Sequence, residues 1–206
     1  MTDILIIHPE NPQLRLIKQA VNTIKNGGII AYPTDSAYAL GCQLGNKKAI
    51  DKIREIRKLD NQHNFTLVCG DLSDLGLYAK IDNVAYRIIK KLTPGPYTFI
   101  FTATKEVPNR LQQKKKKSIG LRVPEHEIVL ALLAELGEPI MSVSLIMPNQ
   151  SLPLNNADEI HQQLNSKVDL IIDGGSCHFE PTTVIDFTDT APRVARKGSG
   201  DTQMFE

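Results

Sequence analysis

Short apolar runs alternate with longer amphipathic segments along most of the chain, and this alternation constrains the fold more than any other feature of the sequence. We expect a first helix that stops at Asn26-Gly27-Gly28, and further helices over about Lys47 to Arg57, Asn83 to Leu92, Glu125 to Leu136 and Asp158 to Leu164. The runs expected to form strands are Ile4 to Ile7, Ile29 to Tyr32, Phe65 to Cys69, Thr98 to Thr102, Ile119 to Val123, Ile140 to Val143, Leu170 to Ile172 and Val184 to Phe187. Such alternation is typical of a layered α/β domain, and tight Gly and Pro turns allow antiparallel neighbours. We therefore predict an α/β fold with a twisted mixed β-sheet and flanking helices.

The first helical segment carries recognisable boundary signals. Asn11 stands where a capping side chain is expected, Pro12 suits the first turn, and the glycines after Asn26 favour a stop. The apolar spacing predicts a core face made of Leu14, Ile17, Val21 and Ile24, and for the helix over 83–92 one made of Val84, Ala85, Ile88 and Ile89.

Length and charge limit the classes of protein to which this chain can belong. A chain of 206 residues with 41% hydrophobic content can bury a full core, so we expect residues 1–206 to form a single domain. Lysine and arginine total 24 against 23 aspartate and glutamate, which leaves a weak overall field. Such a field offers no general attraction for nucleic acid or an anionic membrane, so any RNA site must be local.

The cysteines and the first residues of the chain indicate the cellular compartment in which we expect the protein. The three cysteines, Cys42, Cys69 and Cys177, are odd in number and far apart, which suits neither a disulfide framework nor a Cys-x-x-Cys metal site. We therefore expect reduced thiols in a cytoplasmic protein. The opening segment lacks a positively charged region, and its apolar run is too short for a signal peptide or a membrane span.

The run from Ile29 to Tyr32 ends abruptly in a Pro33-Thr34-Asp35 corner. Proline supplies no amide hydrogen, so the strand ladder is expected to stop there. Ligands of α/β proteins usually bind beyond the carboxyl ends of strands, which would place Thr34, Asp35 and Ser36 against a small molecule. Alternatively, these side chains make the hydrogen bonds of an ordinary turn.

Pro33-Thr34-Asp35 with Tyr38 and Gly41 is similar to a signature of the YrdC/YciO family, which includes threonylcarbamoyladenylate synthases. Further segments carry the resemblance in the family's order: Leu92-Thr93-Pro94-Gly95-Pro96-Tyr97-Thr98, Gly120-Leu121-Arg122-Val123-Pro124, Asp173-Gly174-Gly175 and Pro181-Thr182-Thr183-Val184-Ile185-Asp186. Gly41-Cys42, His63-Asn64-Phe65-Thr66-Leu67 and Ser142-Val143-Ser144-Leu145 resemble the YciO branch more narrowly. The resemblance covers nearly the whole chain and implies a single YrdC-like domain.

The resemblance also implies a reaction. In the family's synthases, L-threonine and bicarbonate form a carbamate that attacks the α-phosphate of ATP, which gives threonylcarbamoyladenylate and pyrophosphate for tRNA modification. Such chemistry depends on aligned reactants and neutralised phosphate charge, so it requires several cations, normally with Mg²⁺. A closed cavity is also expected, because the carbamate and the mixed anhydride are both labile in water.

The resemblance assigns roles to particular positions. Arg122 and Arg196 match the family's arginines, while Arg57 and Lys58 stand near a third cationic motif. Arginine suits phosphate because its planar fork donates two parallel hydrogen bonds. The remaining positions that match substrate or nucleotide contacts are Thr34, Tyr38, Ser144 and Thr183. For each arginine the alternative is a solvated surface residue, and for each hydroxyl an ordinary strand or turn residue.

The sequence departs from the family's pattern at two motifs. Active synthases have a Lys-x-Arg pair where this chain reads Arg57-Lys58-Leu59, and a Ser-x-Asn motif where it reads Ser144-Leu145-Ile146. A guanidinium and an amide are thus replaced by aliphatic side chains. We therefore expect an attenuated reaction, or a different small-molecule activity in the same cavity.

Lys114, Lys115, Lys116 and Lys117 form the one dense block of charge in the sequence. Four adjacent lysines attract phosphate backbones but read no bases, so a solvated loop is the simpler interpretation. The family's preference for double-stranded RNA and its link to tRNA support the alternative that the chain binds RNA without adenylation. The five histidines show no ligand spacing, so we predict no structural metal.

Overall fold

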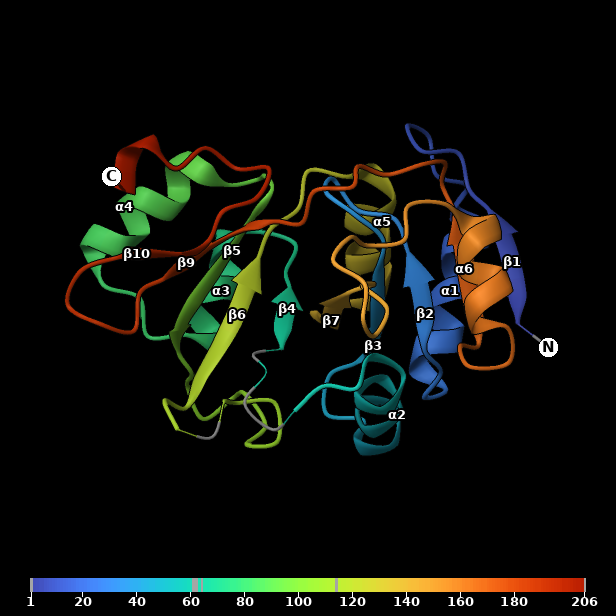
Figure 1. Ribbon diagram of the computed structural model, residues 1–206, viewed down its shortest axis with the longest axis horizontal. Helices are drawn as coiled ribbons and strands as arrows, with labels where there is room; N and C mark the ends of the chain where they lie inside the picture. The colour runs from blue at the N-terminus through green and yellow to red at the C-terminus, as the bar shows by residue number, and fades with distance from the viewer. Residues whose placement is uncertain (1, 61–62, 64, 114, 206) are drawn as a thin grey trace.

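The structure is a computed structural model that describes residues 2–60, 63, 65–113 and 115–205. Its strands form one sheet in the order β1-β8-β2-β3-β7-β4-β6-β5-β9-β10 (Figure 1). The strands are β1 (Asp3–Ile6), β2 (Ile30–Tyr32), β3 (Ala39–Gln43), β4 (Thr66–Val68), β5 (Tyr97–Thr102), β6 (Ser118–Arg122), β7 (Ile140–Ser144), β8 (Leu170–Asp173), β9 (Thr183–Asp186) and β10 (Arg193–Arg196). The helices are α1 (Leu14–Lys25), α2 (Lys47–Arg57), α3 (Leu72–Tyr78), α4 (Asn83–Leu92), α5 (Glu127–Leu136) and α6 (Ala157–Leu164), followed by the 3₁₀ turn η1 (Gln203–Phe205).

The sheet is mixed, as the sequence predicts. β8 lies between β1 and β2 in parallel with both, and β4–β6 and β5–β9 are also parallel pairs. The β2–β3, β3–β7, β4–β7, β5–β6 and β9–β10 pairs are antiparallel. The two chain ends lie at opposite ends of this sheet (Figure 1).

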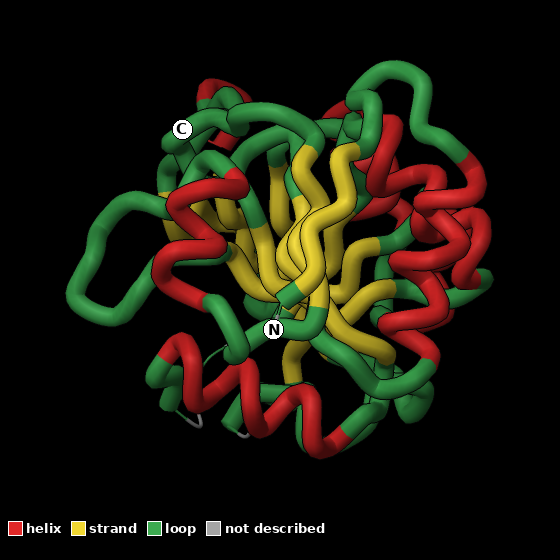
Figure 2. The backbone as a smooth tube through the Cα atoms, turned by 90° about the vertical axis from the view of Figure 1, so that its right-hand side faces the viewer, coloured by secondary structure: helices red, strands yellow, loops and turns green. Residues whose placement is uncertain are grey.

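Helices cover the two faces unequally, and Figure 2 shows them on both sides of the strands. α1 and α5 pack on one face, where Ile17, Val21 and Leu132 share a buried cluster with Ile30 and Ile172. The opposite face carries the larger cluster, which includes the buried residues of α2, α3, α4 and α6. Successive residues of a strand point to opposite faces, so each strand contributes to both clusters.

Within the described residues, the face that α1 and α5 cover is open at its other end. Val68 of β4 packs in their cluster, whereas Thr66, two residues earlier and therefore on the same face, lines a cavity. Thr98 and Gly120 of the neighbouring strands line the same cavity. The uncovered end of this face is thus the floor of the candidate site.

Most of the predicted elements are confirmed. The helices over 47–57 and 83–92 have the predicted bounds, and each predicted strand is found within one residue at either end. The helix ending at Leu136 begins two residues later than expected, and the one ending at Leu164 begins one residue earlier. Two strands, β3 and β10, and the short helix α3 were not predicted.

Some details of the helices were predicted wrongly. Gln13, not Asn11, is the N-cap of α1, and it makes no side-chain capping bond. Leu14 is 60% exposed because it opens the helix, and the buried stripe instead includes Ala20. Val84 is likewise 67% exposed in the first turn of α4. In the described part of the chain, no helix is long and apolar enough to cross a membrane.

Candidate functional site

A cavity of about 440 Å³ lies over the uncovered end of the sheet. Its floor comes from the strands and its wall from the segments after α2 and β7 and from β10. The lining residues are Arg57, Asp60, His63, Thr66, Thr98, Ile100, Gly120, Val143, Ser144, Ile146, Thr182, Val184, Ala195 and Arg196. The site thus combines hydroxyls, arginines and a few aliphatic side chains.

The strand register builds the floor. Ile100 lies opposite Gly120, Gly120 opposite Thr66, and Thr66 opposite Ser142 in one row across four strands. A Cβ on Gly120 would lie 2.8 Å from Oγ1 of Thr66 and 3.1 Å from the carbonyl of Phe65. Glycine therefore keeps the floor open at its centre.

Arg57 enters the wall because it is the last residue of α2. Lys58 follows in the left-handed region, with φ 49°, and turns the chain away from the helix axis. Nε of Arg57 is buried and has no hydrogen-bond partner in the described part of the chain. Burial lowers the pKa of Arg57, which marks a guanidinium short of solvation.

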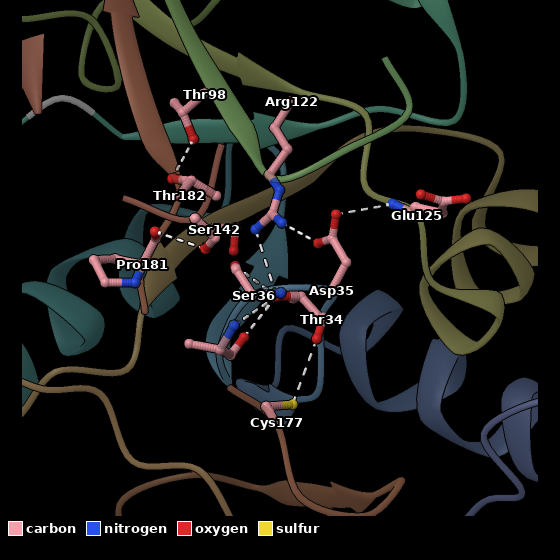
Figure 3. A network of polar contacts seen from close by, with 12 residues as sticks. Thr34, Asp35, Ser36, Thr98, Arg122, Glu125, Ser142, Cys177, Pro181 and Thr182 are labelled. Atoms are coloured by element: carbon pink, nitrogen blue, oxygen red, sulfur yellow. Dashed lines mark hydrogen bonds and ion pairs between the residues drawn. The ribbon is translucent and has the colours of Figure 1, made fainter. Parts of the chain in front are cut away.

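Arg196 enters from the opposite side on β10. Its Nε and Nη2 donate to the carbonyl of Thr182 at 3.1 and 2.8 Å, and Nη2 also donates to Oγ1 of Thr182 at 3.1 Å. That hydroxyl lies 2.9 Å from Oγ1 of Thr98 on the floor (Figure 3). Partial burial, and then the positive charge of Arg122, lower the pKa of Arg196.

His63 reports the electrostatic character of the wall. Burial lowers the pKa of His63 below its ordinary value, and the charges of Arg57, Arg196 and Arg54 lower it further, against the opposing effect of Asp60. The imidazole is therefore neutral near pH 7. A wall whose positive charge depresses a histidine pKa is suited to an anionic ligand.

A second polar network lies deeper, beside the cavity. Arg122 is 7% exposed, and its Nη2 is ion-paired with Oδ1 of Asp35 (Figure 3). Its Nη1 lies 3.5 Å from Oγ1 of Thr34, while the other oxygen of Asp35 accepts from the amide of Glu125 at 3.1 Å. Arg122 is thus neutralised by its own chain.

The Pro33-Thr34-Asp35 corner is the turn of the β2–β3 hairpin. The Thr34 hydroxyl donates to the carbonyl of Ala37 at 2.6 Å and accepts from the amides of Ser36 and Ala37, both at 3.2 Å. Thr34 and Ser36 are buried, and neither is among the residues that line the cavity. The turn interpretation therefore fits these residues, and their contact with a ligand stays a prediction.

Tyr38 and Thr183 also use their hydroxyls within the chain. Tyr38 donates to the carbonyl of Gly175 at 2.8 Å. Thr183 donates to the carbonyl of Gly200 at 2.7 Å and accepts from the amide of Gly198 at 3.0 Å. Tyr38 thus holds the segment that follows β8 against the sheet, and Thr183 holds the segment that follows β10. Thr182, which precedes Thr183, lines the cavity instead.

The predicted site residues therefore separate into two groups. Arg57, Ser144 and Arg196 line the cavity together. Thr34, Tyr38, Lys58, Arg122 and Thr183 do not line it, so their contact with a ligand stays a prediction. Strand alternation is the signal that would have found Thr66, Thr98 and Thr182, whereas nothing in the sequence marks Asp60.

The two departures from the family pattern have different surroundings. Leu59 packs against the larger core cluster, away from the cavity lining, and Lys58 beside it is exposed. Ile146 lines the cavity itself, where the family pattern has an amide. The second departure thus changes the chemistry of the wall directly.

The lysine block lies in the loop between β5 and β6. Lys114 falls outside the described residues, and Lys115, Lys116 and Lys117 are exposed. Lys116 donates to the hydroxyl of Thr188 at 2.9 Å and is ion-paired with Asp189 at 3.3 Å. One lysine of the block is therefore engaged with the chain.

In the part of the chain that the structure describes, carboxylates, histidines and cysteines do not cluster for metal binding. Over the described ranges, no group of three or more such side chains is placed to hold an ion. All three cysteines are free in the structure; Cys42 and Cys69 are buried and Cys177 is half-buried.

The family model described as Telomere recombination, Sua5_yciO_yrdC, matches residues 22–198 of this chain. An uncharacterized protein of Haemophilus influenzae is 56% identical over 206 residues, with 100% of both chains covered. The uncharacterized protein YciO of Escherichia coli is 53% identical over 205 residues and 100% of both chains. Its crystal structure matches with a TM-score of 0.98 at 52% identity, again over 100% of both chains.

Two more distant proteins bear names that refer to threonine. The threonylcarbamoyl-AMP synthase of Vibrio vulnificus is 26% identical over 161 residues, which are 77% of this chain and 86% of that protein. The crystal structure of P. abyssi Sua5 complexed with L-threonine matches with a TM-score of 0.88 at 27% identity. That match covers 96% of this chain and 58% of the other.

Proposed function

The chain belongs to the Sua5/YciO/YrdC family, and we propose that its cavity binds ATP and L-threonine and forms threonylcarbamoyladenylate more slowly than the family's synthases do. The observation that carries the proposal is the meeting of Arg57 and Arg196 with the hydroxyls of Thr66, Thr98 and Thr182 in one cavity. Its volume of about 440 Å³ is that of a small-molecule site.

In the proposed reaction the main role of the protein is to position the reactants. The threonine amine and bicarbonate give a carbamate with loss of water. A carbamate oxygen then bonds to the α-phosphorus of ATP, while the bond from that phosphorus to the bridging oxygen breaks and pyrophosphate leaves. Arg57 and Arg196, from opposite sides, would stabilise the charge on the phosphates.

The oxygen-bearing side chains of the cavity are compatible with Mg²⁺ carried by the nucleotide. Magnesium is usually held by one or two carboxylates together with phosphates and water. Asp60 is the carboxylate among the described lining residues, and the hydroxyls of Thr66 and Ser144 are further oxygen donors. When bound, Mg²⁺ would neutralise phosphate charge beside the two arginines.

We expect a slow reaction because the chain departs from the family pattern at two positions. Leu59 packs into the core and Ile146 offers no hydrogen bond, so two preorganised polar groups are missing from the site. Each such group is worth about 2–4 kcal/mol in comparable sites, or roughly two to three orders of magnitude in rate.

The direct test incubates the protein with ATP, L-threonine, bicarbonate and Mg²⁺ and follows pyrophosphate and the adenylate by mass spectrometry. Arg57→Ala should lower product formation at least about 100-fold. Arg87→Ala, which removes the same charge from the exposed face of α4, should leave it unchanged. Product no higher than in a reaction without protein would reject the proposal.

A gain-of-function variant tests the explanation for the slow rate. Ile146→Asn restores the amide of the family motif to a residue that already lines the cavity. We expect adenylate formation to rise at least about tenfold, while the control Ile146→Leu leaves it near the starting rate. Equal rates for both variants would contradict the role assigned to position 146.

Binding of duplex RNA without adenylation is the second candidate function. It is favoured by the exposure of Lys115 and Lys117 in the β5–β6 loop. Each phosphate contact releases about one counterion, so removing either lysine should lower the slope of log affinity against log salt by about 1. Lys18→Ala on α1 is the matched control, and an unchanged slope in the loop variants would exclude the loop as the RNA site.

A further inference from the structure

A second hollow of about 440 Å³ lies between α2 and the loop that precedes β6. We propose that it is a separate binding site for a small phosphate-bearing anion. Its lining residues are Lys47, Ile50, Asp51, Arg54, Asn109, Arg110 and Gln112. None of them lines the first cavity.

Charge is the first argument. Lys47, Arg54 and Arg110 face this hollow against the single carboxylate of Asp51. Within the described residues, Lys47 and Arg110 have no carboxylate at ion-pair distance. Three cations from two separate segments thus line the hollow with one carboxylate. The local charge there is positive, although the chain as a whole is nearly neutral.

Preorganisation is the second argument. Nη2 of Arg54 donates to the carbonyl of Arg110 at 3.0 Å, and its guanidinium carbon lies 4.9 Å from the centre of the Phe65 ring. These contacts fix the plane of a side chain that otherwise samples many rotamers. A guanidinium held in this way keeps its positive charge at a fixed place in the lining of the hollow, where phosphate oxygens would accept from its N–H groups.

The loop side of the hollow is also held in place. Nε2 of Gln112 donates to the carbonyl of Val107 at 2.8 Å, which closes the loop that carries Asn109 and Arg110. Ile50 is buried beneath them and gives the hollow an apolar base. Fixed cations, amide groups and an apolar base are the elements of a small-anion site.

The spacing on α2 separates this site from the first. Arg54 and Arg57 lie three residues apart and are neighbours on the helix surface, yet Arg54 lines the second hollow and Arg57 the first. Variants of α2 therefore distinguish the two sites. The inference does not depend on the proposed adenylation.

Inorganic pyrophosphate is the probe, and amide NMR shifts locate it while calorimetry gives its affinity. We expect shifts at Asn109, Arg110 and Gln112 that persist in the Arg57→Ala protein. Arg110→Ala should weaken this binding about tenfold. The variant keeps the backbone carbonyl that positions Arg54, so the loss reports the guanidinium itself.

Two paired variants sharpen the test. Lys47→Ala should weaken binding about threefold to fivefold, whereas Lys48→Ala, one residue away on the same exposed turn and lining a different hollow, should not. Asp51→Asn should strengthen binding, because it removes the negative charge from the lining. Thermal unfolding of each variant verifies that it is folded.

Several results would overturn the inference. Equal losses for Lys47→Ala and Lys48→Ala would indicate general charge screening. Shifts confined to residues of the first cavity would place the anion there. Weaker or unchanged binding in Asp51→Asn, or binding of duplex RNA but not of pyrophosphate, would remove the small-anion site.

Discussion

The two ends of one sheet face differ in what covers them. Under α1 and α5, the face presents Ile30, Ile140 and Ile172, which are buried against the helices. At the other end, where no helix from the described residues covers the floor, the same face presents Thr66 and Thr98. Stability is thus concentrated where a helix supplies apolar partners, and the polar floor is left for a ligand to cover.

Arg122 stands between the two ends. It lies opposite Val68, which belongs to the cluster under α5, while its guanidinium pairs with Asp35 beside the cavity. The chain neutralises this buried cation internally, whereas Arg57 and Arg196 have no carboxylate partner at ion-pair distance within the described residues. The comparison therefore predicts that Arg122 contributes to the fold and the other two arginines to binding.

The largest effect should follow from breaking the Arg122–Asp35 pair. Asp35→Asn leaves a cation that is 7% exposed without its counter-charge, and we expect a loss of about 3–5 kcal/mol in the free energy of unfolding. Urea denaturation measures it. The double variant Asp35→Asn, Arg122→Met should lose less than the sum of the single losses.

Arg196→Ala is the control for this experiment, because it removes an arginine of the open end. We expect a change below about 1 kcal/mol. A similarly small change for Asp35→Asn would mean that water reaches the pair, and Arg122 would then belong with the binding residues.

The next prediction compares the loss of an aliphatic side chain at the covered end of the sheet face with a similar loss at the open end. Leu132→Ala on α5 removes a fully buried side chain and should cost about 2–5 kcal/mol. Ile146→Ala in the cavity wall removes a half-buried side chain and should cost less than about 1.5 kcal/mol. Urea denaturation of both variants checks the difference, and comparable losses would show that the open end is as tightly packed as the covered one.

A third experiment fills the floor of the cavity. Gly120→Ala places a Cβ 2.8 Å from Oγ1 of Thr66, which should cost about 1–3 kcal/mol and reduce nucleotide binding. Thr66→Ala in the same chain should restore part of the stability, because the shortest of the three close contacts of the added Cβ disappears. Gly76→Ala is the matched control, since nothing lies within 4 Å of its added Cβ, and it should be neutral or stabilising.

The spacing of apolar residues predicted the layers of the fold well, because the burial of one face of each helix or strand produces that spacing. The helix over 47–57 was located to the residue, and the strand over 119–123 within one residue at either end. β3 was missed because Ala39–Gln43 contains glycine and small residues, which carry little strand signal. β10 was missed because Arg193–Arg196 is a polar edge strand without a buried stripe.

The candidate site was harder to predict because side-chain direction is not a property of a short motif. Thr182 and Thr183 are adjacent hydroxyls, and the pairing of β9 with β5 turns the second inward. The resemblance identified both Arg57 and Arg122. Only the three-dimensional structure reveals that Asp35 neutralises one of them, since the two partners lie 87 positions apart in the sequence.

The smallest effect concerns pH, and it probes the open end alone. The folded-state pKa of His63 lies below its ordinary value of 6.5, so between these two values the unfolded chain binds more protons than the folded one. This contribution to stability is therefore present above pH 6.5 and is lost as the pH falls through that window. His63→Gln should flatten this part of the pH profile without affecting the contribution of His126, whose pKa is also lowered by burial.

A bound phosphate anion would counter the charges of Arg57 and Arg196 and should raise the pKa of His63, which NMR titration of its imidazole measures. A free-protein pKa at or above 6.5, or no rise with pyrophosphate, would contradict a positively charged open end.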